Sequence, residues 1–204
     1  MAKRIGLITA GGDCPGLKAG IRGGAQPGFR DGFEGLGQYR GVLGRVRNRM
    51  HVLSWAEVSG ILAQGGTILG SSNKANPARF AVGIGADGKA IMEDRRPQCL
   101  ELIRREKIET LIVAGGDGSM TIASELAAAA HQAGHSLNVM GVPKTIDNDL
   151  EGTEITFGFQ TAVSIAAEAI DRVKTTAASH HRVMVVEVMG RNAGWIALHA
   201  GVAT

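Results

Sequence analysis

One pattern occurs twice in this sequence: an apolar run, then Gly-Gly-Asp, then small residues that open a helix-forming segment. The first copy joins a strand predicted at 5–10 to a helix predicted at 16–29 through Gly11-Gly12-Asp13. The second joins a strand at 108–114 to a helix at 118–133 through Gly115-Gly116-Asp117-Gly118-Ser119. Buried strands that alternate with helices are typical of a doubly wound parallel sheet with helices on both faces. We therefore expect an α/β fold with both glycine loops at one edge of the sheet.

These two loops have the composition of phosphate-binding turns. Glycine lets the chain turn sharply and lets a ligand approach the backbone, and the following helix directs free N–H groups toward an anion. A carboxylate such as Asp117 could hold Mg²⁺ that bridges phosphates, because this cation prefers oxygen ligands. Either loop alone is equally well explained as a tight strand-to-helix turn, since glycine is the default turn residue. The repetition favours the phosphate-binding interpretation.

A third stretch, 141–150, concentrates charged and polar side chains. It reads Gly-Val-Pro-Lys-Thr-Ile-Asp-Asn-Asp-Leu and follows an apolar run at 137–142 that we interpret as a buried strand. We expect Pro143 to end that strand and Lys144, Thr145, Asp147 and Asp149 to lie on the loop beyond it. The carboxyl ends of strands are where ligands bind in open α/β sheets. The alternative is an ordinary turn rich in Asp and Asn.

Composition limits the functional classes. Thirty of the 204 residues are glycine, about twice average usage. The net charge of +3 is spread along the chain without a basic stripe, which argues against a nucleic-acid partner. Cys14 and Cys99 have neither metal-site nor disulfide spacing, which is typical of a reducing, cytoplasmic compartment. No apolar run reaches the length of a membrane span or a signal peptide, so we expect no membrane partner.

The remaining segments carry weaker signals. We expect a strand at 35–39, an irregular basic stretch at 40–54, and a short helix from Ser54 to Ala63 opened by the capping box Ser54-Trp55-Ala56-Glu57. A glycine- and hydroxyl-rich loop follows at 65–74, and 81–89 has the composition of a flexible loop. Further predictions are helices at 97–106 and 157–177 and a strand at 183–188. His180 and His181 are adjacent and point in different directions in most backbones, so we do not assign them a metal.

Five motifs together resemble the phosphofructokinase family. In chain order they are Gly11-Gly12-Asp13, Gly66-Thr67-Ile68-Leu69-Gly70-Ser71, Gly115-Gly116-Asp117-Gly118-Ser119, Thr145-Ile146-Asp147-Asn148-Asp149 and Met189-Gly190-Arg191. The resemblance runs from about residue 3 to the last residue, and the motifs have family-like spacing. It is far more specific than any one motif alone.

The resemblance implies transfer of a phosphoryl group to the 1-hydroxyl of fructose 6-phosphate, a step of glycolysis. It implies that Asp147 is the base, that Thr145 touches the transferred phosphoryl group, and that Asp117 and Asp149 hold Mg²⁺. Lys144 is the third residue expected to be catalytic. The implied donor-binding residues are Gly11, Gly12, Lys74, Gly116, Asp117, Gly118 and Ser119. The implied substrate-binding residues are Thr145, Asp147, Asp149, Arg182, Met189, Gly190 and Arg191. These roles suit phosphoryl transfer, which needs positioning, a cation and a well-placed base.

The sequence also departs from the family pattern. Lys18 stands where the family usually has asparagine, and Asn73-Lys74 stands where the family usually has an arginine on the donor phosphates. Lysine acts there as a point charge without the bidentate geometry of arginine. The family's chains continue beyond the position of Thr204, so we expect an N-terminal portion. We assign 1–140 to a donor-binding domain and 141–204 to an incomplete sugar-phosphate domain, and expect a homo-oligomer for the complete enzyme.

The donor is ATP or pyrophosphate, and Gly118 and Lys144 favour different donors. In this family a small residue at position 118 goes with ATP, whereas a carboxylate there goes with pyrophosphate because it would repel the nucleotide's α-phosphate. Gly118 leaves that space open. Lys144 is typical of pyrophosphate users, but an added cation excludes neither donor. We therefore favour ATP, with pyrophosphate as the alternative. A non-catalytic phosphate-binding module is the second alternative, against which the three aspartates 117, 147 and 149 argue.

Overall fold

The computed structural model describes residues 3–41, 44, 49–72 and 76–204. The chain divides into two compact units, Met1–Val142 and Pro143–Thr204, which are described separately. The functional roles expected for residues 1–140 and 141–204 stay predictions.

The first unit is built on a mixed sheet. Its spatial order is β3 (Met50–Val52), β2 (Glu34–Gln38), β1 (Arg4–Thr9), β6 (Ile108–Gly115) and β7 (Asn138–Thr145). Strand β1 runs parallel to both β2 and β6, whereas β3 runs antiparallel to β2. The three strands expected near residues 4–10, 109–114 and 137–142 lie side by side, which confirms the α/β fold. The antiparallel edge strand β3 lies in the stretch that we expected to be irregular, and that expectation was wrong.

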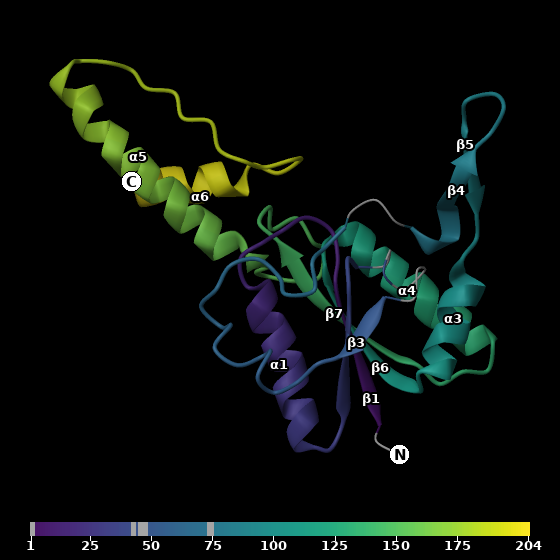
Figure 1. Cartoon of the computed structure of the whole chain (residues 1–204). Helices are drawn as coiled ribbons and strands as arrows, with labels where there is room; N and C mark the ends of the chain where they lie inside the picture. The colour runs from purple at the N-terminus through teal and green to yellow at the C-terminus, as the bar shows by residue number, and fades with distance from the viewer. Residues whose placement is uncertain (1–2, 42–43, 45–48, 73–75) are drawn as a thin grey trace. The chain divides into compact units, whose positions relative to one another are not determined.

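Helices cover both faces of this sheet. Helix α1 (Leu17–Arg30) lies on one side of β1 and β6, and helices α3 (Arg96–Arg105) and α4 (Asp117–Gln132) lie on the other (Figure 1). Leu7 and Ile8 are neighbours on β1 and point to opposite faces, as strand geometry requires. Leu7 packs with α1 residues Ile21 and Ala25, and Ile8 belongs to a separate cluster with residues of α3 and α4, including Ile103, Ala123 and Leu126.

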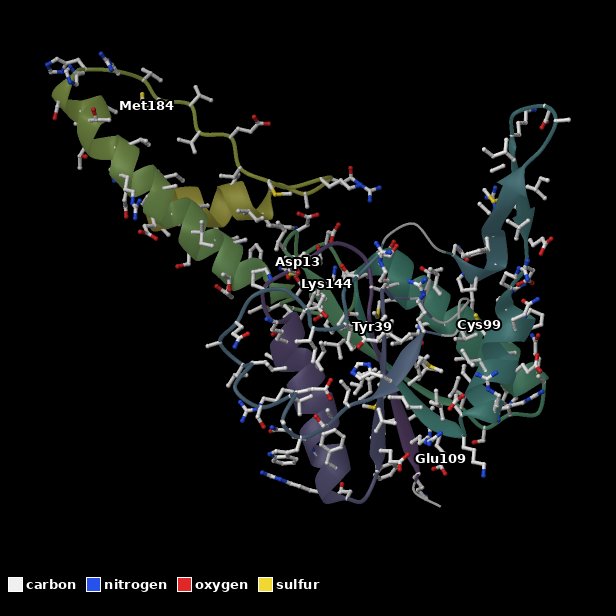
Figure 2. All side chains as sticks on the ribbon, viewed as in Figure 1. Asp13, Tyr39, Cys99, Glu109, Lys144 and Met184 are labelled. Atoms are coloured by element: carbon white, nitrogen blue, oxygen red, sulfur yellow. The ribbon has the colours of Figure 1, made fainter. Side chains whose placement is uncertain are left out.

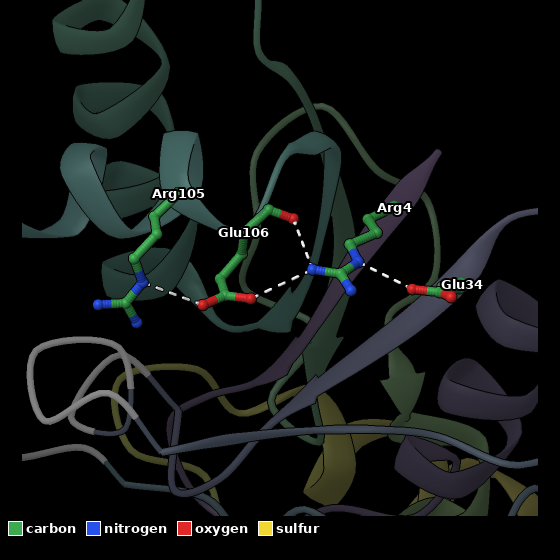
Figure 3. A network of polar contacts seen from close by, with 4 residues as sticks. All are labelled: Arg4, Glu34, Arg105 and Glu106. Carbon is green, nitrogen blue, oxygen red and sulfur yellow. Dashed lines mark hydrogen bonds and ion pairs between the residues drawn. The ribbon is translucent and has the colours of Figure 1, made fainter. Parts of the chain in front are cut away.

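A polar network joins the amino ends of the strands, at the edge opposite the glycine loops. The Arg4 side chain donates from Nε to Glu34 Oε2 at 2.8 Å and from Nη1 to the Glu106 carbonyl and Oε2, each at 3.2 Å. Arg105 Nε donates to the other Glu106 oxygen at 3.1 Å (Figure 3). One half-buried arginine thereby links β1 to β2 and to the turn between α3 and β6.

The capping box forms without the helix that it was expected to open. The Ser54 N–H and hydroxyl each donate to Glu57 Oε2 at 2.8 Å, and the Glu57 N–H donates to Ser54 Oγ at 3.3 Å. The Ser54 backbone N–H and, next, its hydroxyl lower the pKa of Glu57. Residues 55–58 form turns, and Gly60 has a φ of 70°, which ends the helical geometry. The helix predicted from Ser54 to Ala63 was therefore wrong.

A β-hairpin replaces the flexible loop expected at 81–89. After the 3-10 helix η1 (Pro77–Arg79), strand β4 (Phe80–Ile84) pairs antiparallel with β5 (Ala90–Glu93) as a separate two-stranded sheet. Glycines at 83, 85 and 88 obscured the strand pattern in the sequence, because glycine is typical of turns.

The second unit consists of the end of β7, the short strand β8 (Phe157–Gly158), and helices α5 (Phe159–Ser179) and α6 (Trp195–Ala203). Strand β8 runs parallel to β7. The two helices share a small core of Phe159, Ala166, Ile196 and Ala200. Phe159 and Ala166 lie seven residues apart on α5 and therefore share one face of that helix. Among the described residues, no helix is long and apolar enough to cross a membrane.

The strand predicted at 183–188 is wrong. Residues 182–190 are assigned to no helix or strand, and Val183 and Val185 are each 94% exposed. Figure 2 shows side chains projecting from this segment, with Met184 labelled. An apolar, β-branched run becomes a strand when a neighbouring strand supplies hydrogen bonds, which the described chain does not provide here.

The buried strand β6 should dominate the stability of the first unit. Leu111 is 0% exposed and lies in the core beside α3 and α4, so Leu111→Ala should lower the free energy of unfolding by about 2–5 kcal/mol through lost burial and a cavity. Leu62→Ala is the control, because Leu62 is 57% exposed, and should change it by less than about 0.5 kcal/mol. Urea denaturation followed by Trp55 fluorescence, in a Trp195→Phe background, measures both. Equal effects of the two variants would contradict this description of the core.

Candidate functional site

The register between β1 and β6 places the two Gly-Gly-Asp loops level with each other. Thr9 pairs with Ala114, and the Ala10 N–H donates to the Ala114 carbonyl at 2.8 Å. Because the strands are parallel, both loops leave the sheet at its carboxyl edge. The two copies of the motif therefore meet at one place in the first unit, as the sequence predicted.

The loop at 65–74 is hydrogen-bonded to the end of β1 and to the first Gly-Gly-Asp loop. The Thr9 hydroxyl, 1% exposed, lies 2.9 Å from Thr67 Oγ1 and donates to the Gly70 carbonyl at 2.9 Å. The Gly11 N–H donates to the Ser72 carbonyl at 3.2 Å, and Gly11 has a φ of 82° that favours glycine. The glycine- and hydroxyl-rich loop expected at 65–74 thus contacts the first Gly-Gly-Asp loop through its backbone. Lys74, the expected donor-binding cation, lies outside the described residues.

Helix α4 begins directly on the second loop. Gly116 is its N-cap and Asp117 is in its first turn. The first N–H groups of a helix generally lack partners within it, but the Ser119 N–H donates to the Gly116 carbonyl at 2.9 Å. Gly115 must be glycine, because a Cβ there would lie 2.3 Å from the Ser119 Cβ. At Gly118 a Cβ would meet no described atom within 4 Å. The first turn of α4 therefore combines a helix amino terminus, an exposed carboxylate and open space.

Helix α1 offers a second amino terminus at the same edge. Its N-cap, Gly16, has a φ of 91°, and its first turn carries no acidic residue. A Cβ at Gly12, in the preceding loop, would meet no described atom within 4 Å. The Lys18 ammonium, which departs from the family pattern, donates to Gln64 Oε1 at 3.0 Å. Lys18 therefore links α1 to the segment that precedes the loop at 65–74.

In the second unit, the expected catalytic stretch starts on a strand. Strand β7 continues through Pro143 to Thr145, so the expectation that Pro143 ends the strand was wrong. The partner strand β8 begins its pairing at Lys144, opposite Phe157. Pro143 therefore precedes that pairing, at the kind of edge position that tolerates a residue without an N–H. Lys144 is 5% exposed, a degree of burial that is rare for lysine and that its sequence did not reveal.

The loop beyond β7 holds Asp147 and Asp149 through neutral groups. The Asp147 N–H donates to Thr145 Oγ1 at 3.1 Å. Asn148 has a φ of 51°, which asparagine tolerates better than most residues. Its Oδ1 accepts from the Thr156 N–H at 2.9 Å, and its Nδ2 donates to the Glu154 carbonyl at 3.1 Å. The asparagine side chain therefore closes the loop and leaves both carboxylates outside these bonds.

Thr156 is a positioning residue that the sequence reasoning missed. It is 2% exposed, and its hydroxyl donates to the Thr145 carbonyl at 2.7 Å and lies 3.3 Å from Asn148 Oδ1. It lies eight residues beyond Asn148, outside the charged stretch, so residue type and spacing gave no signal.

The residues expected to bind the sugar phosphate lie after α5. Arg182, Met189, Gly190 and Arg191 belong to the exposed stretch that precedes α6. The Arg182 N–H donates to the Ala177 carbonyl at 2.9 Å and continues the end of α5. Their roles stay predictions.

The carboxylates of Asp117 and Asp149 are the expected metal ligands. No group of three or more His, Cys, Asp or Glu side chains suited to a metal is found in the described chain, and this includes the surroundings of His180 and His181. Mg²⁺ commonly uses one or two carboxylates and completes its shell with water and substrate phosphates. Asp117 in the first unit and Asp149 in the second are both exposed, and each carboxylate supplies the oxygen atoms that this cation prefers; their shared role stays a prediction.

Comparisons with known proteins agree with the motifs. The family model described as Phosphofructokinase matches residues 4–204. ATP-dependent 6-phosphofructokinase 2 of Clostridium perfringens is 48% identical over 202 residues, which is 98% of this chain and 53% of that protein. Pyrophosphate--fructose 6-phosphate 1-phosphotransferase of Amycolatopsis methanolica is 46% identical over 201 residues, again 98% of this chain and 53% of that protein. This chain spans about half the length of these curated relatives.

A solved structure extends the comparison to three dimensions. Pichia pastoris phosphofructokinase in the T-state has a TM-score of 0.84 and 32% sequence identity, and the match covers 99% of this chain and 21% of that one. The arrangement of elements described above is therefore shared with a solved protein at moderate sequence identity.

The hydrogen bond from Thr156 to the Thr145 carbonyl, near Asp147, can be tested directly. Thr156→Val keeps the side-chain shape but leaves the Thr145 carbonyl without its donor, so the 145–156 loop should become less stable by about 1–3 kcal/mol. Hydrogen–deuterium exchange of that segment should accelerate accordingly. Thr153→Val is the matched control, because the Thr153 hydroxyl donates to the Ile155 carbonyl at 3.3 Å at the loop surface. Unchanged exchange in Thr156→Val would show that this hydroxyl does not hold the loop.

Proposed function

The chain belongs to the phosphofructokinase family, and on that premise we propose that it carries the phosphoryl-donor site and the catalytic loop of an ATP-dependent 6-phosphofructokinase. The proposed reaction moves the γ-phosphoryl group of ATP to the 1-hydroxyl of fructose 6-phosphate. The observation that carries this proposal is the first turn of α4, where Gly118 leaves open space beside a helix amino terminus.

The donor phosphates would lie against the glycine loops of the first unit. Helix amino termini attract anions through their free N–H groups and their dipole. Gly11, Gly12, Gly116, Gly118 and Ser119 supply backbone there that a phosphate can approach closely. Lys74 would add a cation as a point charge. Asp117 alone would repel phosphates, so a cation between them is a physical requirement of this arrangement.

Mg²⁺ fits that requirement, with Asp117 and Asp149 as its protein ligands. When bound, it would neutralise phosphate charge and orient the donor. Asp147 would accept the proton of the sugar hydroxyl, since a carboxylate held against that group can act as a general base. Thr145 positions Asp147 through the 3.1 Å bond to its N–H, and Lys144 would offset charge on the transferred phosphoryl group. Arg182, Met189, Gly190 and Arg191 would bind the sugar phosphate, with arginine suited to bidentate contact.

Pyrophosphate is the second candidate donor, because one observation favours it. Lys144 is a nearly buried cation on β7, and the Amycolatopsis methanolica relative carries a pyrophosphate-dependent name. A buried lysine would serve either donor, whereas a carboxylate at position 118 would exclude the longer one. Gly118 therefore carries more weight than Lys144. We further propose a homo-oligomer and a cytoplasmic location for the complete enzyme, as the family resemblance implies.

The catalytic role of Asp147 is best measured at the full length of the relatives, by joining this chain to the remainder of the Clostridium perfringens protein. Asp147→Ser in that chimera should lower kcat by about 10²- to 10⁴-fold, the usual effect of losing a general base, and change KM much less. Asp171→Ser on the exposed surface of α5 is the charge-matched control. A coupled assay with fructose 6-phosphate, Mg²⁺ and either donor gives both constants. A near-normal kcat for Asp147→Ser would remove that residue from the role of base.

Donor choice is tested by Gly118→Asp in the same chimera. The added side chain has open space at its Cβ, and its carboxylate would repel the phosphates of the donor. ATP use should therefore fall first, while fructose 6-phosphate binding is largely kept. Gly118→Asn is the neutral control of similar size, which separates charge from volume. Both donors should be assayed side by side. Turnover of the unmodified chimera with pyrophosphate and none with ATP would overturn the preference for ATP.

A further inference from the structure

The β4–β5 hairpin exposes apolar side chains on a sheet that is too small to be stable by itself. Val82, Ile84, Ile91 and Met92 are between 38% and 78% exposed. Figure 1 shows the hairpin projecting beyond α3 and α4 of the same unit. An isolated two-stranded hairpin is marginally stable in water, and either further strands or packing against a helix adds stability. This hairpin is therefore suited to receive another strand.

The two edges of the hairpin differ in how well they are protected. Ala81 pairs with Met92 and Gly83 pairs with Ile91, so Val82 is an extra residue that forms a bulge in β4. Bulges twist an edge strand and hinder pairing with another chain. Strand β5 has no such interruption between Ala90 and Glu93. Among the residues that the structure describes, no strand pairs with its outer edge, so this edge is the one open to an added strand.

The backbone of β5 restricts how an added strand can pair. The Lys89 carbonyl accepts from the Gly85 N–H at 2.7 Å, so the Lys89 backbone faces β4. Antiparallel pairing alternates along a strand, so the backbone groups of Ala90 and Met92 face outward. An added antiparallel copy of β5 must therefore pair these outward residues with one another.

The side chains select one register among the allowed ones. Lys89, Ile91 and Glu93 share one face of β5 because side chains alternate with a period of two. When Ala90 lies opposite Met92 of the second copy, Ile91 meets its own copy and Lys89 lies opposite Glu93 of the second copy. The two-fold symmetry produces this opposite-charge pair twice.

The neighbouring registers are unfavourable. A shift that places Met92 opposite Met92 sets Lys89 against Arg95 and Ile91 against Glu93. The reverse shift, with Ala90 opposite Ala90, sets Lys89 against Ile91. Like charges directly opposite each other destabilise a strand pair, and opposite charges stabilise it. In the described chain Glu93 pairs with Arg95 through Oε2 at 2.7 Å, and this ion pair does not use Oε1.

We propose that the outer edge of β5 binds β5 of a second copy of this chain, antiparallel and around a two-fold axis at Ile91. The product is a four-stranded sheet shared by two chains. Main-chain hydrogen bonds supply the pairing, as in other cases of strand addition, and the Lys89–Glu93 pairs fix the register. The second copy is chosen over other partners because the charge pattern of β5 is complementary to itself.

Charge reversal provides the test. Lys89→Glu and Glu93→Lys, each made alone in the 204-residue chain, set like charges opposite each other at both symmetric positions and should raise the dimer dissociation constant on the order of tenfold. An equal mixture of the two variants should recover the original dimer, because every cross-strand pair is then opposite in charge. The double variant K89E/E93K should recover it as well. Sedimentation velocity over a concentration series measures all of these.

Two further variants complete the design. Met92→Pro removes an outward N–H and should weaken the dimer while sparing the hydrogen bonds to β4. Lys3→Glu gives the same change of net charge as Lys89→Glu, far from the hairpin in sequence, and should leave the dissociation constant unchanged. A chain that is monomeric at all concentrations would overturn the proposal. So would single variants that associate like the original, or a mixture that fails to recover the dimer.

Discussion

The parallel pairing of β1 with β6 is the interaction on which the rest of the first unit depends. It aligns Thr9 with Ala114, so two loops that are about a hundred residues apart in sequence leave the sheet at the same level. Leu7 and Ile8 then direct successive side chains into opposite clusters, which hold α1 on one face and α3 and α4 on the other. The Arg4 network ties the amino ends of the same strands and leaves the carboxyl edge to the glycine loops.

The loops of the two units are shaped by different interactions. In the first, glycine at 11 and 115 allows the backbone to turn and pack where a side chain would be strained or would clash. In the second, neutral bonds from Asn148 and Thr156 shape the loop, and the carboxylates of Asp147 and Asp149 take no part in these bonds. This arrangement is compatible with the roles proposed for the two aspartates.

The sequence predicted those parts of the fold in which local pattern and burial agree. Apolar runs marked β1, β6 and the start of β7, and the two Gly-Gly-Asp loops marked the beginnings of α1 and α4. Prediction from the sequence failed where a neighbouring strand decides whether a segment becomes a strand. Met50–Val52 is too short to show alternation, and it is a strand because β2 pairs with it. The run 183–188 has a strong strand composition and no pairing in the described chain.

Side-chain chemistry was predictable only in part for the same reason. The capping box around Ser54 formed as expected, but Gly60 ended the turn before a helix developed. The burial of Lys144 and the support from Thr156 depend on the pairing of β7 with β8, which the sequence alone did not reveal. The glycine loops were predictable because their conformation is dictated by residue type.

The central claim is that the two Gly-Gly-Asp loops form a single phosphate-binding edge. It is tested most directly by following backbone amide signals of the 204-residue chain by NMR during titration with Mg²⁺ and ATP, and separately with Mg²⁺ and pyrophosphate. The account predicts that the amides of Gly11, Gly12, Gly116, Gly118 and Ser119 shift together, with one common dissociation constant. A response confined to one loop, or no response of either loop, would contradict it.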